Sequence, residues 1–226
     1  KNWMKKIVLV TGASKGIGKA LTEKLLANDF SVIGTSRNGE FDIEHKDFYS
    51  LKLDLSKPES IEIAHKEIFN KFNKIDILIN NAGIGPDLDT DFPERDSFNQ
   101  TFNVNVNGTV FFTEPVIELI TQNGIILNVS SKMGSLDVCE RTDSVAYRMS
   151  KSALNMYTKI LTNRLSKKVR VASIHPGWVK TTIADDNIIN GRLIPEKSAE
   201  NIFEFISKDF KNGIFWDAEN EKELLW

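Results

Sequence analysis

Three side chains near the middle of the sequence could together move a proton. Ser131 is followed by Tyr147, and Lys151 stands four residues after that tyrosine. On a helix, a spacing of four places both side chains on one face, where an ammonium favours the phenolate form of its neighbour. A free phenol has a pKa near 10, and each unit of depression corresponds to about 1.4 kcal/mol. We predict that Tyr147 exchanges protons with a substrate, that Lys151 lowers its pKa, and that Ser131 hydrogen-bonds the substrate oxygen.

The same residues have an alternative structural interpretation. Tyr147 could be a packed aromatic ring, Lys151 an exposed cation and Ser131 a turn residue. A tyrosine four residues before a lysine is common by chance, so the pair alone does not decide between the two interpretations.

A glycine-rich segment near the start of the chain is typical of nucleotide binding. It reads TGASKGIG over residues 11–18 and directly follows the apolar run 7–10. A strand that ends here and a helix that begins near Gly16 would aim free N–H groups and a positive helix end at a pyrophosphate. Gly12 would allow the turn, Gly16 close approach of the ligand, and Gly18 packing of the helix on the strand. The alternative is an ordinary glycine-rich loop. The predicted cofactor contacts in this segment are Gly12, Ser14, Lys15, Gly16, Ile17 and Gly18.

The end of the next apolar run indicates which dinucleotide would bind. It reads Thr35-Ser36-Arg37, without the carboxylate that would accept hydrogen bonds from the ribose hydroxyls of NAD. Arg37 could stack on the adenine or bind a 2′-phosphate, and Lys15 adds a second positive charge. We therefore predict NADP(H), although both cations could simply be solvated surface residues.

Short apolar runs alternate with segments of helical period along the whole chain. The runs cover residues 7–10, 31–35, 48–53, 75–79, 124–129 and 169–174, and their near-continuous hydrophobicity suits parallel strands that are covered on both faces. Between two of them, Ser56 and Glu59 resemble a capping box with Pro58 in the first turn, followed by an apolar stripe at residues 61, 64, 68 and 72. The pattern predicts a single α/β domain over residues 1–226, with a doubly wound, mostly parallel sheet of the Rossmann type and helices on both faces.

Composition excludes several classes of protein. The 226 residues are 41% hydrophobic, enough for one substantial core, and the net charge of −2 argues against nucleic acid as a partner. The only cysteine, Cys139, allows neither an internal disulfide nor a cysteine-built metal site. The basic start from Lys1 to Lys6 is followed by an apolar run too short for a secretion signal, and no segment reaches the length of a membrane span. We expect a cytoplasmic, soluble protein.

No metal site is predicted. Asp87, Asp89 and Asp91 alternate as in a calcium loop, but Phe92 stands where glycine is needed, so we expect a solvated loop. The three histidines are dispersed, without metal-ligand spacing, and we assign them surface or packing roles.

Taken in order, these motifs resemble the short-chain dehydrogenase/reductase family over nearly the whole chain. The resemblance rests on the TGASKGIG segment, Asn80-Asn81-Ala82-Gly83, Asn105 with Gly108, Ser131, Tyr147 with Lys151, and Pro176-Gly177 with Thr181. It implies that Tyr147 is the acid in reduction, that Ser131 orients the carbonyl, and that Lys151 bonds the nicotinamide ribose and lowers the tyrosine pKa. Asn105 would hold a water that links Lys151 to solvent. The remaining implied cofactor contacts are Asp54, Leu55, Asn81, Ala82, Gly83, Pro176, Gly177, Val179 and Thr181.

Within the family, the segments 147–156 and 175–179 and the tail from residue 213 resemble the carbonyl reductases grouped with Sniffer and the bacterial C-factor. This resemblance implies NADPH-dependent reduction of an aldehyde or ketone. The alternatives are another family activity, such as a 3-oxoacyl or sugar-alcohol oxidoreductase, or a cofactor-bound signalling or scaffold protein.

Two details of the catalytic region follow from the resemblance. Ser130 competes for the serine role, but the run Ser131-Lys132-Met133-Gly134 matches the family pattern better. The interval from Ser131 to Tyr147 is longer than the family commonly shows, so residues 137–144 are expected to form an extra loop beside the pocket.

The segment 144–165 is apolar on more than one side of a helix, so it should be buried on more than one side. One side would meet the sheet and the other a second subunit, as in many family members. We expect a homo-oligomer, a dimer or a tetramer. The apolar positions are Ala153, Leu154, Met156, Tyr157, Ile160, Leu161 and Leu165.

Overall fold

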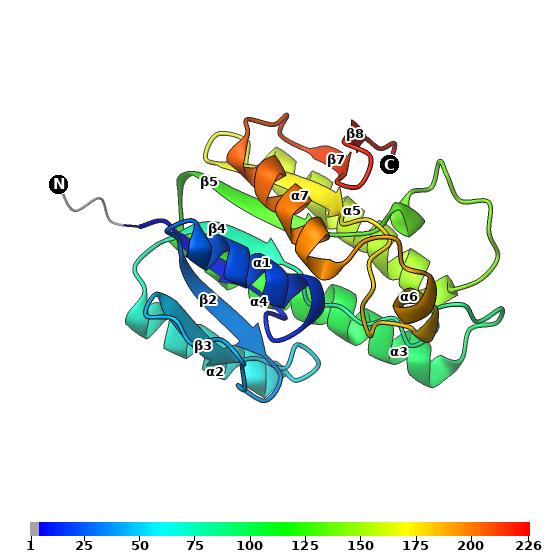
Figure 1. The fold of residues 1–226 in the computed structure, drawn as a ribbon, viewed down its shortest axis with the longest axis horizontal. Coiled ribbons are helices and arrows are strands. Elements are labelled where there is room, and N and C mark those ends of the chain that lie inside the picture. The colour runs from blue at the N-terminus through cyan, green and yellow to red at the C-terminus, as the bar shows by residue number, and fades with distance from the viewer. Residues whose placement is uncertain (1–4) are drawn as a thin grey trace.

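The alternating strands and helices build one sheet in the computed structural model, which describes residues 5–226 (Figure 1). Lys1 to Met4, part of the basic start of the chain, lie outside the described residues. The sheet has the order β3-β2-β1-β4-β5-β6-β7-β8, and all neighbours are parallel except β7 and β8. Its strands are β1 Ile7–Val10, β2 Ser31–Ser36, β3 Phe48–Lys52, β4 Ile75–Asn80, β5 Ile120–Val129, β6 Val169–His175, β7 Ile214–Asp217 and β8 Lys222–Glu223.

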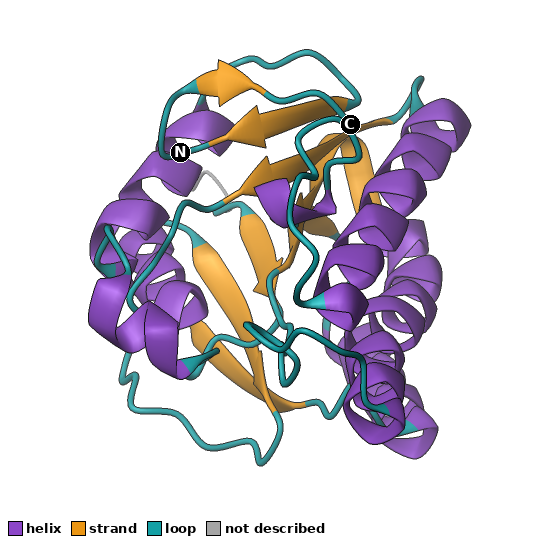
Figure 2. Cartoon of the chain, turned by 90° about the vertical axis from the view of Figure 1, so that its right-hand side faces the viewer, coloured by secondary structure: helices purple, strands orange, loops and turns teal. Residues whose placement is uncertain are grey.

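Helices cover both faces of this sheet (Figure 2). They are α1 Gly16–Ala27, α2 Pro58–Lys71, α3 Arg95–Phe102, α4 Thr109–Val116, α5 Val145–Leu165, α6 Asp185–Asn190 and α7 Pro195–Ser207. A π-helical turn, η1 Asn103–Gly108, joins α3 to α4, and two short 3₁₀ turns are η2 Ile117–Leu119 and η3 Lys132–Gly134. No helix within residues 5–226 is both long and apolar enough to cross a bilayer.

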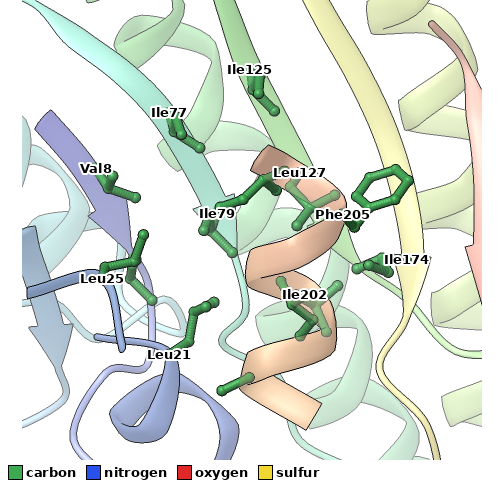
Figure 3. Close-up of a cluster of buried hydrophobic side chains, with 14 of the residues drawn as sticks. Val8, Leu21, Leu25, Ile77, Ile79, Ile125, Leu127, Ile174, Ile202 and Phe205 are labelled. Carbon is green, nitrogen blue, oxygen red and sulfur yellow. The ribbon is translucent and has the colours of Figure 1, made fainter. Parts of the chain in front are cut away.

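Successive residues of each strand point to opposite faces, and this separates two buried clusters. Val8 and Val10 pack with α1 and α7, which lie side by side in front of the sheet (Figure 1). Figure 3 shows Leu21 and Ile202 of these helices beside the strand residues. Leu9, between the two valines, belongs to the second cluster, which α2, α4 and α5 cover. The near-continuous hydrophobicity of the strands thus reflects burial on both faces.

The predicted doubly wound, mostly parallel sheet is confirmed. Five of the six predicted strands match within one residue at each end, but β5 begins at Ile120 rather than at residue 124 because Ile120 still pairs with Ile75. The strand order reverses between β1 and β4, which places the carboxyl ends of β1, β2, β4, β5 and β6 along one edge. In doubly wound sheets, ligands bind at this position.

The predicted capping box at the start of α2 is wrong. Pro58 occupies the first turn as predicted, and this makes Lys57 the residue that precedes the helix. Ser56 therefore lies outside the helix, and its hydroxyl donates to the Asp54 carboxylate at 2.6 Å instead. Phe72 lies just past the end of α2 but packs on the second cluster.

Candidate active site

Ser131, Tyr147 and Lys151 meet at the carboxyl edge of the sheet. Ser131 lies two residues after the end of β5, whereas Tyr147 and Lys151 stand one turn apart near the start of α5, and all three are buried. The Ser131 hydroxyl accepts from the backbone N–H of Met133 at 3.2 Å and lies close enough to the Tyr147 phenol to lower its pKa. The Lys151 ammonium lies 5.5 Å from the centre of the tyrosine ring and donates to the Val129 carbonyl at 2.9 Å. The Ser130 hydroxyl donates to the backbone carbonyl of Lys151 at 3.4 Å.

The pKa of Tyr147 is shifted in the direction opposite to the sequence prediction. Burial raises it to about 12, the hydrogen bond with Ser131 lowers it, and the Asp87 carboxylate raises it. Burial also lowers the pKa of Lys151 to about 8. The predicted depression is absent because both groups are removed from water and the ammonium is directed at a carbonyl. At neutral pH the phenol keeps its proton, which is the form that a proton donor requires.

Asn105 lies in the π-helical turn η1, a type of irregularity that is frequent at functional sites. Its side-chain amide is buried, accepts from the backbone N–H of Ile84 at 2.9 Å, and donates to the Ile84 carbonyl at 2.8 Å and to Ser150 at 3.1 Å. Gly83 is the residue before Ile84, and a Cβ on it would lie 3.4 Å from the Lys151 ammonium, so the backbone of Gly83 lies close to Lys151. Asn105 thus fixes the segment after β4 against the start of α5.

The glycine segment forms a tight turn between β1 and α1, and α1 begins at Gly16 as predicted. Gly12 and Gly16 have φ values of 69° and 54°, in the region that favours glycine. A Cβ on Gly18 would lie 2.0 Å from the Gly12 carbonyl oxygen, so Gly18 lets the helix pack on the turn itself. The Asn81 amide donates to the carbonyls of Thr11 at 2.9 Å and Gly12 at 3.1 Å, which joins this turn to the end of β4.

Two exposed cations stand at the same edge. Lys15 precedes α1 and donates to the Thr182 hydroxyl at 3.2 Å, and Arg37 follows the last residue of β2. Asp54 lies close to Arg37: burial acts to raise its pKa, but hydrogen bonds from Ser56 and nearby cations hold the pKa below its usual value.

The segment after β6 approaches the glycine turn. A Cβ on Gly16 would lie 3.4 Å from the Thr181 methyl group. Gly177 has a φ of 94°, and the Ser198 hydroxyl donates to the Pro176 carbonyl at 2.7 Å. The predicted cofactor contacts therefore share one edge of the sheet, on segments that end or follow its strands: Gly12, Ser14, Lys15, Gly16, Ile17, Gly18, Ser36, Arg37, Asp54, Leu55, Asn81, Ala82, Gly83, Pro176, Gly177, Val179 and Thr181.

The prediction that Asp87 belongs to a solvated loop is wrong. Its side chain is buried and accepts from the backbone N–H groups of Ala146 at 2.7 Å and Tyr147 at 3.2 Å. Asp89 and Asp91 are exposed, as expected. The sequence carries no signal for this difference, because a carboxylate in a polar loop is ordinarily solvated. Residues 136–144, between η3 and α5, form no helix or strand, and an extra loop over residues 137–144 beside the pocket stays a prediction.

Known proteins resemble this chain over most of its length. The family described as short chain dehydrogenase matches residues 6–189. A 3-oxoacyl-[acyl-carrier-protein] reductase of Buchnera aphidicola is 32% identical over 80% of this chain and 77% of its own length. The farnesol dehydrogenase of Aedes aegypti is 31% identical over 84% of this chain and 83% of its own.

Solved structures resemble the fold equally closely. The carbonyl reductase Sniffer of D. melanogaster superimposes with a TM-score of 0.85 at 28% identity, over 99% of this chain and 100% of its own. An NADPH-bound carbonyl reductase from chicken fatty liver has a TM-score of 0.86 at 24% identity, with the same coverage. The family match and the arrangement of the sheet lead to one conclusion: the chain belongs to the short-chain dehydrogenase family and is an oxidoreductase.

Proposed function

We propose that this protein uses NADPH to reduce an aldehyde or ketone to an alcohol, with Tyr147 as the proton donor. The observation that carries the proposal is the buried Tyr147 phenol, protonated at neutral pH and close to Ser131 at the edge where a nucleotide would bind. When bound, NADPH would supply the hydride for the carbonyl carbon.

The side chains of the site then have complementary roles. The Tyr147 phenol donates its proton to the substrate oxygen, and the Ser131 hydroxyl hydrogen-bonds that oxygen as negative charge develops. Lys151 has a pKa of about 8, so it is largely charged at pH 7 and stabilises the phenolate that remains after transfer. A water held by Asn105 as a proton relay remains a prediction.

NADP(H) is supported by the charge at the end of β2. Arg37 is exposed there and Lys15 is exposed just before α1, and both could contact a 2′-phosphate. Gly12 and Gly16, at positive φ, carry no side chain in the turn where a pyrophosphate would approach. The NADPH in the chicken carbonyl reductase, which shares the fold, supports the same choice.

The test follows NADPH absorbance with a panel of aldehydes, diketones, quinones and acyl ketones. Tyr147→Phe should lower turnover by roughly 10²–10⁴-fold because it removes the proton donor. Tyr157→Phe is the matched control, since Tyr157 is buried on the same helix and donates to Glu114 at 2.8 Å, away from the site. Full activity of Tyr147→Phe would refute the proposed donor.

The same panel separates the alternatives. The 3-oxoacyl-[acyl-carrier-protein] reductase relatives favour an acyl ketone as the substrate, and preferential turnover of acyl ketones would support that activity. Tight NADPH binding without turnover of any carbonyl would favour a signalling or scaffold role.

We also propose that the protein is a homo-oligomer. Leu154 and Leu161 of α5 are buried against the sheet, whereas Met156 is 62% and Ile160 50% exposed on another side of the helix. Phe111 of α4 is 67% exposed. Exposed apolar side chains of this kind suit contact with a second copy. Light scattering at micromolar concentration should give the mass of a dimer or tetramer, and the double variant Met156→Glu with Ile160→Glu should dissociate it. A monomeric mass for the native chain would contradict the proposal.

A cytoplasmic location for the protein stays a prediction.

A further inference from the structure

We propose that Asp87 positions the catalytic tyrosine: its buried carboxylate holds the first turn of α5, on which Tyr147 stands. This inference rests on the proposed function of Tyr147. Asp87 is only 1% exposed, and its two oxygens accept from the N–H groups of Ala146 and Tyr147 at 2.7 and 3.2 Å. Within residues 5–226 no lysine or arginine lies within 4.0 Å of this carboxylate. A buried charge requires compensation, and here the helix N–H groups supply it.

The start of α5 lacks the usual cap of its own. Ser144 precedes the helix with a left-handed backbone, φ 56° and ψ 44°, and its side chain does not bond the first turn. Its hydroxyl instead accepts from the backbone N–H of Asp89 at 3.0 Å, and its own N–H donates to the Thr90 carbonyl at 3.0 Å. The first N–H groups of a helix need acceptors, and Asp87 provides one from a segment nearly sixty residues earlier.

The same segment also contacts the tyrosine ring. A Cβ on Gly85 would lie 3.0 Å from Cδ2 of Tyr147, so the backbone at Gly85 packs on the ring. The neighbouring residue, Ile84, is fixed through both of its backbone polar groups by Asn105. The chain from Ile84 to Asp87 therefore restrains both the ring and the backbone of Tyr147. The position of the phenol beside Ser131 depends on this placement.

The charge of Asp87 affects the phenol as well. Asp87 acts to raise the pKa of Tyr147, whereas the other charged group beside the ring, Lys151, is directed at the Val129 carbonyl. At the start of α5, Asp143 is paired with Arg148 and Arg141. Removing the Asp87 charge should lower the pKa of Tyr147, so its phenol should ionise at lower pH.

The test compares Asp87→Asn with Asp91→Asn, a change at an exposed position in the same loop. The Asn amide keeps the size of the side chain and one acceptor, so Asp87→Asn should fold. We expect NADPH to bind within about twofold of the native affinity, KM to be little changed and kcat to fall about tenfold, because the tyrosine is misplaced at the chemical step. Ionisation of the Tyr147 phenol, followed by ultraviolet absorbance against Tyr147→Phe, should move to lower pH in Asp87→Asn alone.

Equal kcat and equal ionisation of the Tyr147 phenol in the two variants would overturn the proposal. A lower kcat with unmoved ionisation of the phenol would also overturn it, because general destabilisation would explain that result. If the native protein turned over no carbonyl, the proposed function would fail, but amide hydrogen exchange would still test Asp87. Exchange at Ala146 and Tyr147 should be faster in Asp87→Ala than in Asp91→Asn, and equal exchange would refute the positioning role.

Discussion

The two ends of the sheet edge that carries the site are held by different kinds of contact. At the nucleotide end, defined as the turn 11–18 with Asn81, the contacts are made to backbone: Gly18 packs on the Gly12 carbonyl, and the side-chain amide of Asn81 donates to two carbonyls of the turn. The substrate end is defined as residues 84–90, the start of α5 and residues 178–193, which we propose to border the substrate. Carboxylates hold its loops, although Thr181 of the last segment also approaches the glycine turn. A glycine pattern reveals the first kind of contact in a sequence, whereas a single loop carboxylate does not reveal the second.

The segment 178–193, which we propose covers the substrate, is held together at its two ends. Glu219 accepts from the Arg192 guanidinium at 2.6 and 2.9 Å and from the Trp178 N–H at 3.1 Å. The backbone N–H of Arg192 donates to the Trp178 carbonyl at 2.7 Å. The two ends of the segment that contains α6 therefore lie next to each other. One carboxylate from the region after β7 therefore ties both ends of this segment.

Gly18→Ala is expected to have the largest effect, because it disrupts the packing of α1 on the glycine turn at the nucleotide end. The added Cβ would meet the Gly12 carbonyl oxygen at 2.0 Å, and neither backbone can yield without moving α1 or the turn. We expect a loss of about 1–3 kcal/mol or more in the free energy of unfolding, and NADPH binding too weak to titrate. Urea unfolding and fluorescence titration measure the two effects. Glu23→Ala, at an exposed position of the same helix, is the control and should leave both nearly unchanged.

The sequence predicted the elements whose patterns are local. Apolar runs marked six strands, and TGASKGIG marked the turn before α1, because strand burial and left-handed glycines leave periodic or compositional traces. The short strands β7 and β8 and the π-helical turn at Asn105 were not predicted, since they depend on long-range pairing and packing. Polar residues inside strands, such as Asn80 hydrogen-bonded to Asn128 at 2.8 Å, give no sign of their partner in the sequence.

The candidate site shows the same division. The grouping of Ser131, Tyr147 and Lys151 followed from their order, whereas the pKa of Tyr147 did not, because it depends on burial. The sequence also gave no sign of the role of Asp87. Its carboxylate accepts from N–H groups of α5, a helix that begins nearly sixty residues later in the chain.

Arg37→Ala should sharpen the comparison, because it removes an exposed side chain just after β2 and leaves the backbone contacts of the nucleotide end in place. A charge-assisted hydrogen bond contributes about 1.5–3 kcal/mol, which corresponds to roughly 10–150-fold in affinity. NADPH should bind more weakly by this factor, whereas NADH, without the 2′-phosphate, should bind as before. Titration of both nucleotides checks the prediction. Equal losses for the two would show that Arg37 does not read the phosphate.

Arg192→Met tests the tie at the substrate end. The Arg192 side chain is half exposed, so its ion pair with Glu219 contributes about 1 kcal/mol or less. We expect KM for the carbonyl to rise up to about fivefold, with little change in NADPH affinity, because residues 178–193 would close less tightly. Arg170→Met is the control: Arg170 pairs with Asp209 at 2.7 Å, outside the site, and its loss should leave KM unchanged. A KM equal to that of the control would show that closure does not depend on this pair.

The smallest effect is expected from Asp143→Asn, seen in the dependence of stability on pH. Burial acts to raise the pKa of Asp143, but hydrogen bonds from Arg148 and Arg141 outweigh it and hold the pKa below its usual value. A carboxyl whose pKa is lower in the folded state stabilises the protein above its unfolded pKa, near 3.9, and loses this contribution as the pH falls through its folded pKa. The native protein should therefore exceed Asp143→Asn by about 1 kcal/mol at pH 7, and the two should converge in acid. Asp209→Asn removes an ion pair of the same 2.7 Å length from a carboxylate that is 97% exposed, so its effect should be smaller. Urea unfolding from pH 7 to pH 3 compares the three proteins, and equal losses in both variants would show that burial at the start of α5 does not strengthen the pair.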